Sequence, residues 1–116
     1  MNKVILLGNV GADPEMRMAD GVTTARFRMA TTERRRGKGP DGNEIELPPI
    51  TEWHNIVMFG RAAQFAELYI RKGVKLLVVG KLRTRSWEDR NAIKRYITEI
   101  YVDSFELMPR SNTTPS

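Results

Sequence analysis

The sequence predicts an all-β fold that carries a single helix. Its Val, Ile, Leu and aromatic residues gather in short runs, and several runs alternate with polar residues as half-buried strands do. Only one segment places apolar residues at helical spacing. With 116 residues, the chain has room for one domain around one continuous core.

The first two predicted strands are separated by turn-forming residues. Residues 4–7 form a short apolar run, and glycines and an Asp-Pro pair follow it. A turn at residues 20–21, Asp-Gly, leads into the second strand over residues 24–31. That strand alternates, with apolar side chains on one face and Arg26 and Arg28 on the other.

A loop, a third strand and the helix come next. Residues 33–49 are polar and rich in Arg, Gly and Pro, so we expect a loop with its tip at residues 39–43. The third strand is predicted over residues 51–59. Residues 61–71 carry the helical pattern, with apolar residues at i, i+3, i+4 and i+7: Ala62, Phe65, Ala66 and Tyr69.

The predicted fourth strand, residues 74–87, is the most informative segment. It begins as a buried run of Val and Leu and continues with four side chains that share one face: Lys81, Arg83, Arg85 and Trp87. The other face would hold Leu76, Val78, Gly80 and Leu82. Cations that follow phosphates, beside an indole on which a base can stack, favour single-stranded nucleic acid. The alternative is a solvated strand face with one Trp packed under a loop.

The order of elements predicts the fold. After a turn near residues 89–91, a fifth strand is expected over residues 94–107, with apolar residues on both parities. Five strands with one helix between the third and fourth are the order of an OB-fold, a partly open five-stranded Greek-key barrel. We place this domain at residues 1–108 and expect residues 109–116 to be a disordered tail or the start of a linker.

Charge and composition narrow the class of protein. Nineteen Lys and Arg against fourteen Asp and Glu give a net charge of +5, which points to a polyanionic partner. The absence of cysteine excludes disulfides and thiolate metal sites. No apolar stretch has the length of a membrane span, and the N-terminal apolar run is too short for a signal peptide. We therefore expect a cytoplasmic protein without a membrane partner.

The polar residues do not predict an enzyme. The single histidine, His54, is more typical of packing than of catalysis, and no second His or Cys accompanies it. Four carboxylates in the last third of the chain show no pairing suited to acid–base work: Glu88, Asp89, Glu99 and Asp103. A nuclease would need the clustered carboxylates of a two-metal site. We expect no catalytic residue, no metal and no cofactor.

Four motifs, in this order, closely resemble the bacterial single-stranded DNA-binding proteins. They are residues 2–11 with 13–15, residues 51–54 with 57–60, residues 69–73, and residues 82–87. The resemblance covers nearly all of residues 1–108. It implies an OB-fold assembled as a homotetramer that binds single-stranded DNA without sequence preference and without chemistry, in replication, recombination and repair at the nucleoid.

The resemblance also assigns roles to individual residues. Trp53, Phe59 and Trp87 match positions whose rings stack on bases, and His54 matches a position at a subunit interface. Periodicity alone does not decide which face of residues 51–59 is exposed, and a phenylalanine at the end of a strand also suits a core. An OB-fold protein that binds RNA, or one that serves a primosome-type assembly, remains an alternative.

The chain departs from the family in two places. Arg35, inside a run of three arginines, stands where a further stacking aromatic is common, and the run would act as an arm over the DNA backbone. The acidic tip that docks replication and repair proteins is missing, so such partners are expected only if the full-length protein has a longer acidic tail. The expected backbone contacts are Arg26, Arg28, Arg34, Arg35, Lys81, Arg83 and Arg85.

Overall fold

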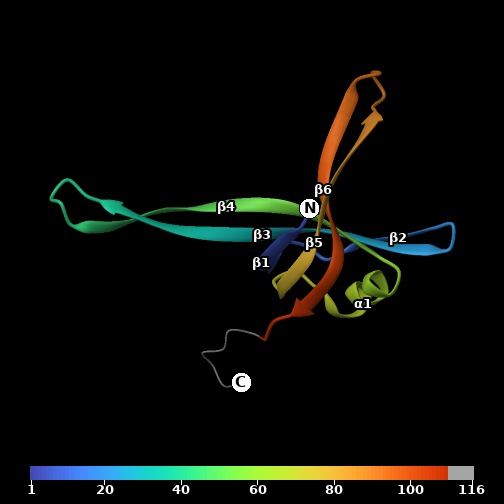
Figure 1. Cartoon of the computed structure of the whole chain (residues 1–116), viewed down its shortest axis with the longest axis horizontal. Coiled ribbons are helices and arrows are strands. Elements are labelled where there is room, and N and C mark those ends of the chain that lie inside the picture. Colours follow the sequence, from blue (N-terminus) through green and yellow to red (C-terminus); the bar gives the residue numbers. More distant parts are fainter. Residues whose placement is uncertain (110–116) are drawn as a thin grey trace.

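The computed structural model describes residues 1–109, in which six strands and one helix are present (Figure 1). The strands are β1 (Val4–Val10), β2 (Glu15–Ala19), β3 (Val22–Lys38), β4 (Glu44–Phe59), β5 (Lys75–Glu88) and β6 (Lys94–Leu107), and the helix is α1 (Arg61–Tyr69). The predicted tail lies, apart from Pro109, outside the described residues.

Five of the strands close into a barrel, as the sequence predicted. The strand order β1-β5-β6-β4-β3 is completed by pairing of β1 with β3, and α1 lies between β4 and β5 in the chain. The pairing of β4 with β6 is parallel and the others are antiparallel. Closure requires Gly8, because a Cβ there would lie 2.1 Å from the backbone oxygen of Ala30. These features confirm the OB-fold.

The sixth strand, β2, was not predicted. It pairs with the start of β3 as a hairpin, with Ala19 opposite Val22. Both residues of the connecting turn have positive φ, 52° at Asp20 and 78° at Gly21, as a two-residue hairpin turn requires. Asp-Gly is a strong hairpin signal, so the sequence contained the information for this strand.

The predicted loop over residues 33–49 is instead a long antiparallel hairpin. Strand β3 continues to Lys38 and β4 begins at Glu44, with these two residues paired. The hairpin, called here the β3–β4 arm, extends away from the barrel (Figure 1). Both of its faces meet solvent, so it lacks the alternation that identifies a half-buried strand. The predicted tip at residues 39–43 is confirmed. There the backbone N–H of Asn43 donates to Asp41 Oδ1 at 3.0 Å.

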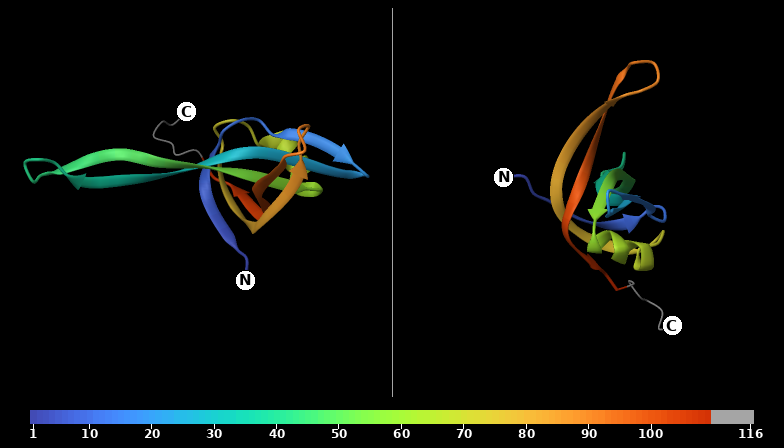
Figure 2. Two further views of the ribbon diagram at one scale, coloured as in Figure 1. Left: turned by 90° about the horizontal axis from the view of Figure 1, so that it is seen from above. Right: turned by 90° about the vertical axis from the view of Figure 1, so that its right-hand side faces the viewer.

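Strands β5 and β6 form a second hairpin. Its outer part, residues 82–99, leaves the barrel in another direction and is called here the β5–β6 arm (Figure 2). Its turn begins at Asp89, as expected near residues 89–91. Leu82 was expected on the core-facing side, but it is 47% exposed because β5 has already left the barrel there. The helix also ends earlier than predicted, at Tyr69, because Ile70 has extended backbone and is buried.

The core explains the mixed pattern of the last strand. Buried side chains of β3, β4, β5 and β6 fill the barrel, among them Phe27, Met58, Leu76 and Ile100. Along β6 the pairing shifts, since Val79 faces Ser104 while Gly80 faces Val102. This bulge inserts one residue and exchanges the two faces. Val102 and Phe105 can therefore both pack against the core although their parities differ.

Candidate nucleic-acid interface

The barrel decides which face of β4 is exposed. Ile56 and Met58 lie in the core, whereas the opposite parity, which carries Trp53, Asn55 and Phe59, is accessible except at Val57, which is buried. Trp53 is 49% exposed and Phe59 is 42% exposed. Both rings are thus accessible, as stacking on bases requires, and neither serves as a core plug in this chain.

Trp53 is held between an arginine and a glycine. The Arg28 guanidinium carbon lies 4.8 Å from the centroid of the indole ring, within cation–π range. Gly11 lies against the ring, since a Cβ at that residue would be 2.4 Å from Trp53 Cζ3. The indole occupies this place only because Gly11 has no side chain.

Phe59 is paired with an aromatic that the sequence analysis did not select. The ring of Tyr101 on β6 lies 5.3 Å from the Phe59 ring, tilted by 58°. The Arg83 guanidinium carbon is 5.6 Å from the Tyr101 ring centroid. Tyr101 lies opposite Val57 of β4 and Lys81 of β5, and because both partners are distant in the chain, no local sequence signal could have found it.

The basic residues of β5 are paired with Tyr101, Glu99 and Ile97 of β6. Arg85 lies 5.6 Å from the ring centroid of Trp87, which is 44% exposed. Lys81 reaches Asp103 at 4.0 Å, a weak exposed contact. Together with Arg83 on Tyr101, these contacts support the shared face that the alternation of residues 81–87 predicted.

Glu99 is the one buried charged residue among the described residues, at 2% exposure. Its Oε1 accepts a hydrogen bond from Arg85 Nε at 3.0 Å, and its Oε2 lies 3.4 Å from Arg26 Nε. The hydrogen bond to Glu99 raises the pKa of Arg85 above its usual value, so this guanidinium stays charged. Two of the predicted phosphate-binding arginines therefore share one carboxylate, which the sequence analysis had assigned no role.

A groove with a volume of about 230 Å³ runs between these groups. Residues from β2, β3, β4, β5 and β6 line it, including Glu15, Arg26, Arg28, Asn55, Arg85, Ile97 and Glu99. Asn55 donates to the Thr98 backbone oxygen at 3.4 Å, which links β4 to the base of the β5–β6 arm. The structure thus brings Arg26, Arg28 and Arg85 together between Trp53 and the arm.

The β3–β4 arm is less cationic than its arginine run suggests. Arg34 lies 3.7 Å from Glu46, Arg36 lies 3.0 Å from Glu44, and Arg35 donates twice to the Pro48 oxygen. Residues 33–49 carry four cationic and four acidic side chains, so their formal net charge is zero. Contacts of Arg34 and Arg35 with a nucleic-acid backbone stay a prediction, from an arm that is electrostatically balanced.

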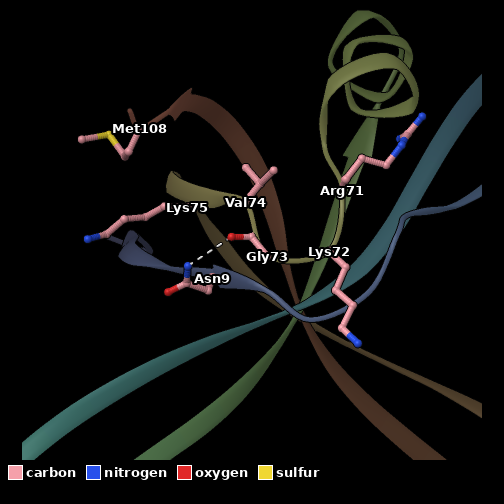
Figure 3. A pocket seen from close by; sticks show the side chains of 7 residues that line it. All are labelled: Asn9, Arg71, Lys72, Gly73, Val74, Lys75 and Met108. Carbon is pink, nitrogen blue, oxygen red and sulfur yellow. Dashed lines mark hydrogen bonds between the residues drawn. The ribbon is translucent and has the colours of Figure 1, made fainter. Parts of the chain in front are cut away.

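A second cationic group lies near the opposite end of β5. Arg71, Lys72 and Lys75 line a cavity of about 520 Å³ together with Asn9, Gly73, Val74 and Met108 (Figure 3). Asn9 Nδ2 donates to the Gly73 oxygen at 3.4 Å across this cavity. Asn9 also pairs with Ala30, which pairs with Trp53, so β3 and β1 connect these cations to the aromatic face. The sequence analysis placed Arg71 on the helix and missed this group.

His54 is half-buried, and its Nε2 lies 2.8 Å from Thr31 Oγ1 on the neighbouring strand. Its place at a subunit interface stays a prediction. Among residues 1–109, no group of three or more His, Cys, Asp or Glu side chains is arranged to hold a metal ion. Within the same residues, no helix is long and apolar enough to span a membrane.

Comparison with known proteins agrees with this geometry. The model of the single-strand binding protein family matches residues 1–108. A single-stranded DNA-binding protein of Bacteroides thetaiotaomicron is 47% identical over 109 residues, which are 93% of this chain and 66% of that protein. The chain therefore spans slightly less than two thirds of this relative. A solved structure of the Plasmodium falciparum SSB complex with ssDNA superposes with a TM-score of 0.80 at 30% identity, over 94% of this chain and 96% of that one.

Proposed function

Because the chain belongs to the single-strand binding protein family, we propose that it binds single-stranded DNA without sequence preference and without catalysing a reaction. The name of the Bacteroides relative and the DNA-bound state of the Plasmodium structure support this proposal. We extend it to the roles of such proteins in replication, recombination and repair, and to a cytoplasmic, nucleoid-associated location.

One observation carries the proposal: three exposed aromatic rings each lie close to an arginine or to a second ring that has an arginine near it. Trp53 has Arg28 beside it, Trp87 has Arg85, and Phe59 lies against Tyr101 with Arg83 near. Every base presents a face that can stack, so rings of this kind bind a single strand whatever its sequence. The guanidinium groups suit the phosphates between successive bases.

The cations contribute unequally to this surface. Arg28, Lys81 and Arg83 have no close carboxylate partner among the described residues except Asp103, which lies at the limit of contact with Lys81. Arg26 and Arg85 share Glu99, so together they retain one net positive charge. We assign the main electrostatic attraction of phosphate to Arg28, Lys81 and Arg83. Arg26 and Arg85 would contribute hydrogen bonds from a fixed place on the surface.

Self-association as a homotetramer is part of the proposal. The outward side chains of β1 include Ile5 and Leu7, 64% and 48% exposed, and they pair with Val79 and Leu77 of β5. An exposed apolar sheet face of this kind favours burial against another copy. Replication and repair proteins would be further partners if the full-length protein has a longer acidic tail.

Titration with oligo(dT), followed by tryptophan fluorescence at several salt concentrations, tests the proposal. We expect quenching of the emission and an affinity that falls as salt rises. The slope of log K against log salt should be about −2 if Arg28, Lys81 and Arg83 alone contact phosphate. It should be about −5 if all seven predicted cations do. No quenching at low salt would contradict the proposed function, and equal affinity for poly(U) and poly(dT) would extend it to RNA.

A further inference from the structure

The Glu99 carboxylate accepts hydrogen bonds from two arginines, one from each side of the groove. Arg26 belongs to β3 of the barrel, and Arg85 belongs to β5 where the β5–β6 arm begins. We propose that Glu99 is a positioning residue for single-strand binding: it holds Arg26 and Arg85 through their Nε atoms, so that their terminal nitrogens line the groove for phosphate. This inference rests on the proposed function.

The atoms of the contact support a positioning role. Each carboxylate oxygen accepts from one Nε, Oε1 from Arg85 and Oε2 from Arg26. An arginine has five N–H donors, so the donors on the terminal nitrogens of both side chains remain available. Both guanidinium groups also line the groove, with 34% and 46% of their side chains exposed. They can therefore meet a ligand without leaving Glu99.

Burial of Glu99 also argues that the arrangement serves more than stability. A buried carboxylate costs free energy unless it is paired, and even a paired one is weak evidence for stabilisation. Here the carboxylate fixes two long side chains that would otherwise sample many rotamers. Binding would otherwise have to order them, at a cost of roughly two- to twelvefold in affinity for each side chain. Because of Glu99, the Arg26 and Arg85 side chains are already ordered before the nucleic acid binds.

Glu99→Gln separates positioning from simple charge. In the amide only one of the two terminal atoms is an acceptor and the other is an NH₂ donor, so the present contacts, one oxygen to each Nε, cannot both be kept. Arg26, which makes the longer contact, should leave. Removing an acidic residue from a DNA-binding surface would otherwise tighten binding, and Glu88→Gln at the exposed end of β5 serves as the matched control.

We expect Glu99→Gln to bind oligo(dT) about two- to twelvefold more weakly than the parent, the range that corresponds to ordering one arginine. Its salt slope should become shallower by about 0.7, the contribution of one phosphate contact. Glu88→Gln should bind as well as the parent or more tightly. If Glu99→Gln also binds as well or more tightly, with a steeper slope, the positioning role is wrong. If the parent itself does not bind, the proposed function fails instead.

A second variant keeps the test decisive if Glu99→Gln does not fold. Arg26→Lys retains the charge and leaves Glu99 paired, but the single ammonium group would be taken up by the carboxylate. Arg17→Lys on β2 is its control, because the Arg17 Nε also lies against a carboxylate, Glu15 at 3.7 Å, and Arg17 is not among the assigned DNA contacts. We expect Arg26→Lys to lose about two- to twelvefold in affinity and Arg17→Lys to bind like the parent. Equal binding by Arg26→Lys and the parent would overturn the inference.

Discussion

Replacing Gly11 by alanine should move the Trp53 indole and leave the barrel intact. A Cβ on Gly11 would lie 2.4 Å from Cζ3 and 2.9 Å from Cη2 of the ring, whereas ordinary contacts begin near 3.4 Å. The edge of the ring must therefore move by about 1 Å. This edge is the far end of a half-exposed side chain, so the movement requires no change in the core.

The free energy of unfolding should change little. Gly11 is not among the glycines with positive φ, and its amide donates to the Arg28 oxygen at 2.8 Å, a bond that alanine preserves. Alanine in a compatible backbone stabilises by about 0.4–1 kcal/mol through the unfolded chain, which offsets the cost of moving the ring. We expect the unfolding free energy of Gly11→Ala to lie within about 1 kcal/mol of the parent value.

Binding should change more than stability does. A complete stack on Trp53 is worth about 1–3 kcal/mol, and displacement of the ring should remove part of it, about 1 kcal/mol or fivefold in affinity. Fluorescence titration with oligo(dT) measures this loss, and thermal melting measures stability. Gly39→Ala at the tip of the β3–β4 arm, where a Cβ meets Ile45 at 3.1 Å, is the control and should bind like the parent.

A double variant shows whether the loss passes through Trp53. Adding Gly11→Ala to Trp53→Ala should cause no further loss, because no ring remains to be displaced. The reasoning is refuted if Gly11→Ala binds like the parent while its Trp53 signal changes. It is equally refuted if the double variant binds clearly more weakly than Trp53→Ala alone.

Three further substitutions and one titration test other parts of the surface. Trp87→Ala should weaken binding by about 1–3 kcal/mol without unfolding the protein, and parental affinity in the folded variant would remove this ring from the site. Arg35→Ala should lose affinity mainly at low salt and only slightly, because the β3–β4 arm has no net charge; a large loss at high salt would contradict this. Ile5→Glu should shift the assembly toward smaller species in light scattering, and an unchanged mass would place the interface elsewhere. The backbone amide of Ile93 and the Arg95 side chain lower the pKa of Asp89 below its usual value of 3.8. The hydrogen bonds of Asp89 in the turn of the β5–β6 arm should therefore be fully formed above pH 3.8 and lost as the pH falls through the lower pKa of the folded protein. Loss of these bonds at a higher pH, in an NMR titration of the turn amides, would disprove this.

Several parts of the fold and the site were determined by local sequence. The alternation of residues 24–31 fixed which side chains of β3 enter the core, and the run 74–87 predicted a strand with cations and Trp87 on one face. Turn residues marked the tips of both arms. These features could be predicted because alternation, helical spacing and turn chemistry depend on residues that are close in the chain.

Other features escaped prediction because their partners are distant or because solvent replaces a core. The β3–β4 arm looks like a loop in sequence, since neither of its faces packs on the barrel. The exposure of Trp53 could not be predicted from residues 51–59, because both faces of that strand mix polar and apolar residues. In the structure Ile56 and Met58 pack in the core, and Trp53 lies on the opposite parity.

The Glu99 cluster shows the same limit most clearly. The carboxylate meets Arg85 fourteen positions away and Arg26 seventy-three positions away. The sequence determined that arginines line these strands, through alternation that each strand carries by itself. Only the tertiary structure decided that two of them share a buried acid, because closure of the barrel brings β3, β5 and β6 together at that point.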